Sequence, residues 1–290
     1  MKKKILKIIG LLSVLVLVFF ISLPTLLNKA GLHPEFESKK YNFANKRAVI
    51  ISTSHTTLNK PGETTGKLTG VFASELTVPY YEFTDSGIEV DLASINGGTI
   101  PIDPESFYYI VKTSSDDRYL EDPILKEKVK NSIKIDELEI DNYDLVFVAG
   151  GWGAAYDLGY SEILGKKISQ AYYNPKSIIG GVCHGVLGFI NAKDSIGNLI
   201  IKNRRMTGVT DKQIKELGID FTPQHPEEEL IKAGAIFESK TAVRDVFANL
   251  TVVDDESKFV TGQNQNAGHE TSQKMMEILK NKQWILILET

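Results

Sequence analysis

The stretch from Ser177 to Gly188, SIIGGVCHGVLG, constrains the fold more than any other part of this 290-residue chain. Its first half is apolar and β-branched, which is typical of a buried strand, and the residues after Gly185 are typical of a helix. Gly181 and Gly185 flank Cys183, the only cysteine in the sequence, at two residues on either side. Small neighbours around a reactive side chain at a strand-to-helix turn are the signature of a nucleophile elbow. We therefore predict an α/β fold with Cys183 at the end of a strand.

A lone cysteine in an apolar run is more often a small buried hydrophobe than a nucleophile. The flanking glycines favour the catalytic interpretation here, because glycine inside a plain strand or helix costs about 0.5–1 kcal/mol relative to alanine. The amino end of the following helix would favour a thiolate on Cys183. One cysteine also excludes an internal disulfide and a zinc site of the zinc-finger type.

Residues 1–30 differ in kind from the rest of the chain. Three consecutive lysines, Lys2 to Lys4, precede an apolar stretch over residues 8–27 that shows no polar face. Twenty helical residues at about 1.5 Å each span roughly the 30 Å core of a bilayer. The stretch is longer than the apolar part of a typical signal peptide, and residues 26–30 offer no convincing cleavage site. We therefore favour an uncleaved anchor, with residues 5–27 in the membrane.

The lysines set the expected orientation of this segment. Positive charge before a spanning helix keeps that end in the cytoplasm. The prediction is a cell-membrane protein with one N-terminal span and its domain on the extracytoplasmic side. A cleaved leader would instead make the protein secreted.

The remaining chain divides into a tether, residues 31–46, and one domain, residues 47–290. Pro79 should kink the first helix of this domain or mark its start, and residues 284–288 should form a docked strand or a packing tail. Alternation of strands and helices predicts a mainly parallel sheet covered on both faces, a three-layer flavodoxin-like sandwich. We expect strands at 47–53, 88–95, 143–149, 177–182, 242–253 and 258–261, and helices at 70–83, 160–173, 184–192, 227–234 and 266–282.

The charge and histidine content narrow the classes of partner. A net charge of −4 provides no basic field for phosphates, so we expect no nucleic acid. No two histidines have helical metal-ligand spacing, so we predict no metal, and we expect no cofactor. The apolar C-terminal residues leave a homodimer open.

Four motifs carry a resemblance to a known family. They are Ala149-Gly-Gly-Trp-Gly153, Cys183-His184-Gly185, Gly70-x4-Glu75-x3-Pro79-x3-Phe83 and Phe259-Val-Thr-Gly-Gln-Asn264. With them the chain resembles the ThiJ/PfpI superfamily over about residues 47–279, and within it the branch of heat-shock chaperones and glutathione-independent glyoxalase III proteins. The sheet of that superfamily is also the sheet of class I glutamine amidotransferases, so the resemblance implies the same fold.

The chemistry of a cysteine nucleophile assigns roles to the neighbouring residues. Such a nucleophile needs a proton acceptor and donors for an oxyanion. His184 supplies the imidazole, and the backbone N–H groups of Gly151 and His184 would form the oxyanion hole. The resemblance implies that Glu75 points at Cys183 and acts as a protonated acid or proton shuttle. A carboxyl beside a thiolate has its pKa raised by like charge and burial, which suits that role.

Two departures from the family pattern stand out. Where relatives complete a Cys-His-acid triad, this chain has Ile214, so Asp211, Gln213 or Glu216 would have to substitute by a shift of register. Trp152 occupies a place where this branch often has histidine, and an indole there would make the pocket narrower and more apolar.

The five histidines of the chain differ in what the sequence suggests for them. His55 follows the first strand and is a candidate pocket residue. His225 lies between turns that contain prolines, and His269 opens the last helix, so we assign surface or capping roles to both.

Three functions remain open from the sequence. The first is a glyoxalase III-like lyase in which Cys183 adds to a small 2-oxoaldehyde and a 2-hydroxy acid is released. The second is an amidase or peptidase-like cysteine hydrolase, as other branches of the superfamily suggest. The third is an exported redox sensor or chaperone, in which Cys183 oxidises to a sulfinic acid stabilised by Glu75.

Overall fold

Seven short apolar strands form the central sheet of the structure, a computed structural model that describes residues 2–32, 34, 36 and 38–288. The strands are β1 (Arg47–Ser52), β4 (Glu89–Ser94), β5 (Ile133–Lys134), β6 (Leu145–Val148), β7 (Ile178–Val182), β10 (Thr251–Val253) and β11 (Phe259–Gly262). Their order is β10-β11-β7-β6-β1-β4-β5, and only the β10–β11 pair is antiparallel. The predicted mainly parallel, flavodoxin-like α/β sheet is confirmed.

Helices and two small ribbons complete the described chain. The α-helices are α1 (Lys2–Lys29), α2 (Ala73–Asp85), α3 (Ser114–Glu121), α4 (Pro123–Lys130), α5 (Ala154–Asp157), α6 (Glu162–Tyr173), α7 (Asp211–Leu217), α8 (Pro226–Lys232) and α9 (Gly268–Leu288). The 3-10 helices are η1 (Pro104–Phe107), η2 (Ile140–Asn142), η3 (Leu158–Tyr160), η4 (Cys183–Phe189), η5 (Asp245–Phe247) and η6 (Gln265–Ala267). The ribbons pair β2 (Thr57–Leu58) with β3 (Lys67–Leu68), and β8 (Arg205–Met206) with β9 (Ile236–Phe237).

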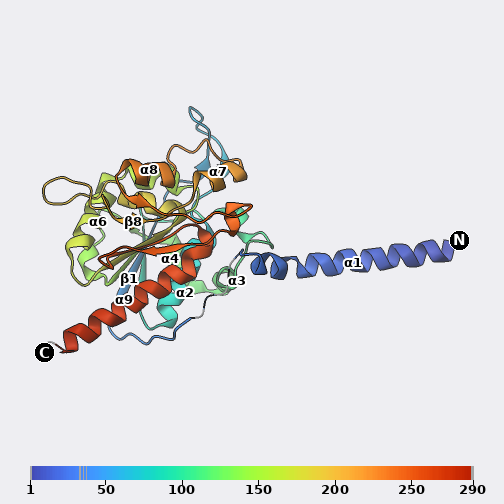
Figure 1. The fold of residues 1–290 in the computed structure, drawn as a ribbon, viewed down its shortest axis with the longest axis horizontal. Coiled ribbons are helices and arrows are strands. Elements are labelled where there is room, and N and C mark those ends of the chain that lie inside the picture. The colour runs from blue at the N-terminus through green and yellow to red at the C-terminus, as the bar shows by residue number, and fades with distance from the viewer. Residues whose placement is uncertain (1, 33, 35, 37, 289–290) are drawn as a thin grey trace.

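The alternation of side chains along β1 explains the three layers. Ala48 and Ile50 belong to a core with residues of α2, α4 and α9, whereas Val49 and Ile51 belong to a second core with residues of α6, η4 and α8. All four side chains are fully buried. Successive residues of a strand point to opposite faces, so an entirely apolar strand needs cover on both. Figure 1 shows helices on the two sides of the sheet accordingly.

Several elements differ from the sequence prediction. The helix predicted at 184–192 is the tighter 3-10 helix η4, and the strand predicted at 242–253 is confined to β10, with η5 before it. Helix α2 begins at Ala73 and continues through Pro79. Helix α9 continues through residues 284–288, so the docked strand considered for them is not formed. Packing of α2 between β1, β4 and α9 stabilises it despite the proline, which costs an isolated helix about 3 kcal/mol.

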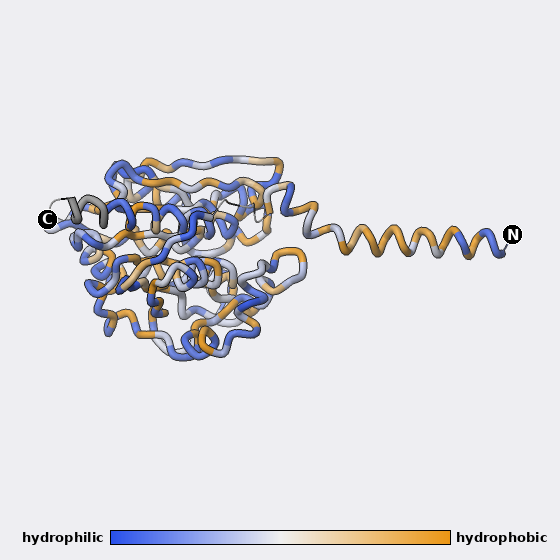
Figure 2. The backbone as a smooth tube through the Cα atoms, turned by 90° about the horizontal axis from the view of Figure 1, so that it is seen from below, coloured by the Kyte–Doolittle hydropathy of each residue, from blue (hydrophilic) through white to orange (hydrophobic). Residues whose placement is uncertain are grey.

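The amino-terminal helix stands apart from the domain. Figures 1 and 2 show α1 projecting from the molecule as a single apolar rod. Among the described residues it is the one helix long and apolar enough to cross a membrane, and none of its apolar window is buried. The segment predicted as a tether is partly docked on the domain, because Leu32 and Phe43 are buried and Lys39 pairs with Glu277 at 2.6 Å.

Glycine at 185 is required by a contact between two backbones. A Cβ on Gly185 would lie 2.2 Å from the carbonyl oxygen of Val148 at the end of β6. That atom belongs to the backbone of a central strand and cannot move aside. The elbow after β7 therefore packs directly against the carboxyl end of the neighbouring strand, which places the cysteine beside the loop that follows β6.

This contact predicts a difference between two glycine-to-alanine changes. Gly185→Ala should lower the free energy of unfolding by at least about 1–3 kcal/mol, the usual cost of overpacking. Gly268→Ala is the matched control, because Gly268 has a helical φ of −55° and its Cβ would meet nothing closer than 3.7 Å. Urea unfolding of both variants checks the prediction. Equal stabilities would show that the elbow does not depend on this contact.

Candidate active site

Cys183 lies at a strained turn between β7 and η4. Its φ is +55°, in the left-handed region that a non-glycine residue rarely adopts. Such a conformation costs on the order of 1–3 kcal/mol and persists only where the surrounding structure enforces it. The parallel pairing of β7 with β6 and β11 enforces it from one side, and the packing of Gly185 on Val148 enforces it from the other. This is the backbone geometry of a nucleophile elbow.

Glu75 approaches the cysteine from the first turn of α2. Its side chain is buried, and the N–H of Gly150 donates a hydrogen bond of 3.0 Å to its Oε2 atom. Burial raises the pKa of Glu75 to about 8, although hydrogen bonds from Cys183 and from the N–H groups of Gly150 and Gly151 act the other way. The carboxyl group is therefore protonated at neutral pH. A Cβ on Gly150 would lie 2.5 Å from this oxygen, so only glycine leaves room for the carboxyl.

The sulfur of Cys183 is enclosed by groups with opposing effects. Burial, and then the negative charge that Glu75 carries when ionised, raise the pKa of the Cys183 thiol, whereas the N–H groups of His184 and Gly151 lower it by hydrogen bonding. The two amides expected to form an oxyanion hole thus converge on the sulfur. The resting thiolate expected from the helix dipole is not what the structure favours, because burial outweighs one short 3-10 helix. Ionisation of Glu75 would raise the pKa of the thiol further, so a thiolate is opposed least while Glu75 keeps its proton.

His184 faces the sulfur with one ring nitrogen. Its Nδ1 atom lies 3.4 Å from the Sγ atom of Cys183, and its ring packs against Trp152 with centroids 4.9 Å apart. Burial lowers the pKa of His184 to about 3, so the imidazole is neutral. Its Nε2 atom is buried and has no hydrogen-bond partner in the part of the chain that the structure describes. The contact between His184 and an acid, which would complete a Cys-His-acid triad, is therefore not formed among the described residues.

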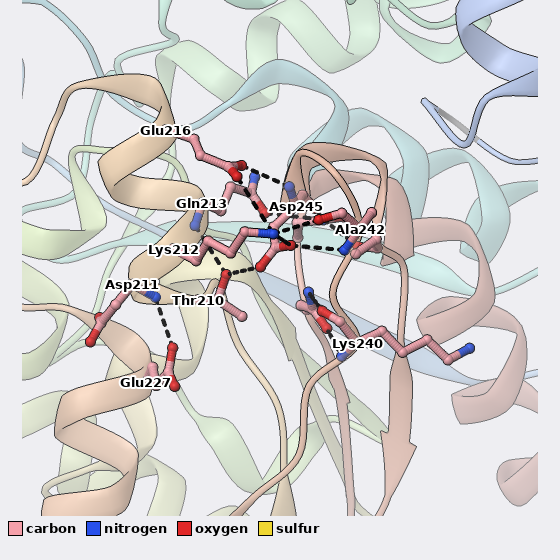
Figure 3. Close-up of polar contacts among 12 residues, drawn as sticks. Thr210, Asp211, Lys212, Gln213, Glu216, Glu227, Lys240, Ala242 and Asp245 are labelled. Atoms are coloured by element: carbon pink, nitrogen blue, oxygen red, sulfur yellow. Dashed lines mark hydrogen bonds and ion pairs between the residues drawn. The ribbon is translucent and has the colours of Figure 1, made fainter.

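Neither acid expected as a third triad member reaches His184 within the described ranges. Ile214 is fully buried in α7. Figure 3 shows Glu216 directed to Asp245, whose backbone N–H donates a hydrogen bond of 2.7 Å to Glu216 Oε2. Asp211 is the first residue of α7 and lies next to the start of α8, where its Oδ1 atom is 3.6 Å from Nδ1 of His225.

A cavity of about 260 Å³ opens above the sulfur. Its walls are mainly apolar and include residues that the sequence did not indicate, since they come from loops and helices distant in the chain. Besides Cys183, His184, Glu75, Gly151 and Trp152, the lining residues are Phe72, Glu105, Tyr108, Ile110, Val111, Val209, Gln213, Leu217, Ile219, Val246 and Gln265. A wider groove of about 1010 Å³ beside α6 and α8 contains none of the predicted site residues.

The candidate pocket residue His55 does not line this cavity. Its ring stacks on Tyr156 with centroids 4.2 Å apart, and its Nε2 atom is 2.5 Å from the carbonyl oxygen of Thr57. The chain turns into β2 directly after β1, which directs this side chain away from the sulfur. Trp152, in contrast, lies in the cavity wall as expected.

Metal-ligating side chains are dispersed over the described part of the chain. No three histidine, cysteine, aspartate or glutamate side chains within it gather closely enough to hold a metal ion. Around Cys183 the structure places an imidazole, a carboxyl group and backbone amides, which can carry protons and donate hydrogen bonds.

Known proteins with similar sequences and structures cover most of the chain. Glyoxalase 3 of Candida albicans is 30% identical over 236 residues, which are 79% of this chain and 97% of that protein. The glutathione-independent glyoxalase HSP31 of Saccharomyces cerevisiae is 26% identical, over 82% of this chain and 100% of the yeast protein.

Two solved structures share the fold with substantial identity. The Rapid Encystment Protein of 24 kDa from Francisella tularensis superposes with a TM-score of 0.73 at 32% identity, over 81% of this chain and 99% of that one. The crystal structure of glyoxalase III from Candida albicans superposes with a TM-score of 0.71 at 26% identity, over 80% of this chain and 97% of that one. The model of the DJ-1/PfpI family matches residues 68–278. The elbow, the buried glutamate, the sheet and these matches together show that the chain belongs to the DJ-1/PfpI family.

Proposed function

We propose that this protein is a cysteine-dependent, glutathione-independent glyoxalase that converts small 2-oxoaldehydes into 2-hydroxy acids. The observation that carries the proposal is the buried cluster of Cys183, His184 and a protonated Glu75 beneath a cavity of about 260 Å³. The names of the relatives from Candida albicans and Saccharomyces cerevisiae supply the class of reaction. The cluster supplies a thiol within the protein, which is the group that glutathione would otherwise provide.

The first step is addition of sulfur to the aldehyde. The Sγ atom of Cys183 forms a bond to the aldehyde carbon, and the aldehyde oxygen takes a proton from Glu75, which then recovers the proton of the thiol. The N–H groups of Gly151 and His184, which already point at the sulfur, lie where they can donate to that oxygen. Donors that are in place before charge develops stabilise the transition state without reorganisation. The product is a hemithioacetal on Cys183.

The second step moves a hydrogen between two carbons. The former aldehyde carbon loses its C–H proton to the neutral Nδ1 atom of His184 while the neighbouring carbonyl oxygen takes a proton from Glu75, which gives an enediol. The proton on His184 then returns to that neighbouring carbon, and the hydroxyl group on the former aldehyde carbon gives its proton back to Glu75, which leaves a 2-hydroxyacyl thioester. One carbon is oxidised and its neighbour reduced, so no external oxidant is needed. Water then cleaves the thioester, which releases the 2-hydroxy acid and restores the thiol.

The cavity walls favour one class of 2-oxoaldehyde. Trp152, Ile110 and Val246 are among the apolar side chains that line the cavity, and Glu105 lines it as well. A short alkyl or aryl substituent would bury apolar surface against these walls, which is worth about 25 cal/mol per Å². Charged sugars or peptides would lose hydration there without a charged partner close to the sulfur.

The two other functions have less support from the geometry. A redox-sensing cysteine is typically accessible and of low pKa, whereas Cys183 is 7% exposed and its pKa is raised by burial. An amide hydrolase would use the same two amides for its oxyanion. The names of the relatives from Candida albicans and Saccharomyces cerevisiae favour the glyoxalase reaction over hydrolysis.

We also propose that α1 is an uncleaved membrane anchor with the domain on the extracytoplasmic side. Its support is the length of the helix, its mean hydropathy of 2.7 and its exposure along the whole apolar window. Exposed apolar residues of a helix this long are stable only in lipid or against a partner. Lysines at its start favour a cytoplasmic N-terminus.

The catalytic cysteine is tested with methylglyoxal and the full-length chain in the absence of glutathione. Wild-type protein should form lactate, and Cys183→Ala should lower the rate at least about a thousandfold, because no other thiol exists in the chain. His55→Gln is the matched control and should keep wild-type activity, since this ring lies outside the cavity. Turnover that survives loss of the sulfur would refute the proposed function.

The protonated state of Glu75 predicts a pH-dependent stability. The folded pKa of about 8 exceeds the ordinary value of 4.5, so wild-type protein loses stability as the pH rises between these values. Glu75→Gln removes that loss. Above pH 8 its free energy of unfolding should exceed that of the wild type by up to about 5 kcal/mol, with little difference near pH 4.5.

The same variant should lose activity by about a hundredfold or more, because a proton carrier is missing. Urea unfolding at pH 5 and pH 9, together with methylglyoxal turnover, checks both parts. A stability difference that is the same at both pH values would show that Glu75 is not held protonated.

The anchor is tested by fractionation of cells that express the full-length chain. The protein should stay in the membrane pellet after alkaline carbonate washing. Protease added outside the inner membrane should degrade the domain and leave the N-terminal lysines protected. Soluble protein that has lost about its first thirty residues would identify a cleaved signal peptide instead.

A further inference from the structure

Three buried polar atoms near the elbow lack hydrogen-bond partners among the described residues. They are Nε2 of His184, Nε2 of His225 and Oδ1 of Asp211. They belong to η4, to the residue that precedes α8 and to the first residue of α7. Leaving a buried polar atom without a partner is destabilising, so three such atoms in one region need an explanation.

The packing of the elements brings these residues together. Helix α8 packs against η4 and against α7. A Cβ on Gly208 would lie 3.1 Å from the side chain of Pro226 and 3.3 Å from the carbonyl oxygen of Cys183, so the start of α8 lies beside the elbow. The backbone N–H of Asp211 donates a hydrogen bond of 2.8 Å to Glu227, which joins the starts of α7 and α8. Figure 3 shows this contact.

The two imidazoles are within electrostatic reach of each other. Besides burial, the one cause that lowers the pKa of His184 is the charge of His225. His225 in turn lies 3.6 Å from Asp211, measured between Nδ1 and Oδ1, which is an ion-pair separation. The side chain of His225 is 17% exposed and that of Asp211 is 37% exposed. His184, His225 and Asp211 therefore form a row of side chains. This row leads from the buried sulfur to a carboxylate at the edge of solvent.

The protonation states along this row are mutually consistent. When Nδ1 of His184 accepts a proton from the thiol or the substrate, its Nε2 atom must carry hydrogen and needs an acceptor. Nε2 of His225 is such an acceptor when its Nδ1–H faces the carboxylate of Asp211. In this arrangement each of the three orphaned atoms has a partner.

We propose that His225, held by Asp211, takes the place of the triad acid that is missing at Ile214. Its Nε2 atom accepts the hydrogen on Nε2 of His184, which fixes the tautomer and the orientation of that ring toward Cys183. In the structure both Nε2 atoms are still without a hydrogen-bond partner among the described residues, so the proposed bond forms in the working site. His225 touches no reacting atom, so it is a positioning residue. Its effect on turnover rests on the proposed glyoxalase function, whereas its effect on the thiol does not.

The experiment compares variants of the full-length chain in detergent. His225→Leu removes both ring nitrogens at similar volume, and Asp211→Asn removes only the charge. His269→Leu is the matched control, because His269 also pairs with a carboxylate, Glu82, at 2.8 Å, but lies outside the cavity at the start of α9. The first readout is the rate of alkylation of Cys183 by iodoacetamide at pH 7. The second is kcat and KM for methylglyoxal.

The proposal expects His225→Leu to slow alkylation at least fivefold and to lower kcat at least tenfold, with KM within threefold of wild type. Asp211→Asn should lower both rates at least threefold, and the double variant should be no slower than His225→Leu, since both act through one row. His225→Gln should recover most of the rate, because its amide oxygen can accept from His184. The control should match wild type in both readouts.

Alkylation and kcat within twofold of wild type in His225→Leu would overturn the proposal, and so would additive losses in the double variant. If His225→Leu does not fold, Asp211→Asn decides, because its side chain is more than one-third exposed; unchanged rates in that variant would equally overturn the proposal. Wild-type protein that fails to turn over methylglyoxal would refute the proposed function. The alkylation rates would still decide the role of His225.

Discussion

The proton held on Glu75 is the interaction on which the rest of the site depends. An ionised carboxylate at this depth would oppose both its own burial and a thiolate beside it, so the site works only while Glu75 is neutral. Burial keeps it neutral by raising its pKa to about 8, and the N–H of Gly150 fixes its orientation. A neutral carboxyl can donate to sulfur, whereas a carboxylate can only repel a thiolate. Burial therefore has two effects. It raises the pKa of the Cys183 thiol, and it keeps Glu75 protonated so that Glu75 can act as the acid when the thiol reacts.

The fold produces this enclosure through contacts between backbones. Parallel strands β6 and β7 end at the same edge of the sheet, where α/β proteins usually bind ligands. The loop after β6 carries Gly150 against Glu75, and the turn after β7 carries Gly185 against Val148. Side chains at either glycine would separate the two loops and admit water to the sulfur. The left-handed φ of Cys183 is the strain that results from this close approach, and the paired strands on both sides of β7 hold it in place.

Sequence reasoning correctly predicted the features that depend on local sequence pattern and missed those that depend on tertiary packing. Runs of β-branched residues correctly located the central strands, and the spacing around Cys183 located the elbow. The length of η4 could not be predicted, because its tight turns follow from the contact of Gly185 with Val148, which are distant in the chain. His55 was expected near the pocket because it follows β1, but its stacking on Tyr156 is a tertiary contact. The raised pKa of Cys183 was missed for the same reason, since a helix dipole is visible in a sequence and burial is not.

With Ile214 where relatives have the triad acid, the proposed site keeps its chemistry by placing a carboxylate elsewhere. A carboxylate placed directly on His184 would add a second buried negative charge close to Glu75 and Cys183, and desolvating it would be costly. In the proposed row the carboxylate is that of Asp211, whose side chain is 37% exposed, and His225 lies between it and the elbow. Solvent then offsets part of the cost of that negative charge, at the expense of weaker stabilisation of a protonated His184.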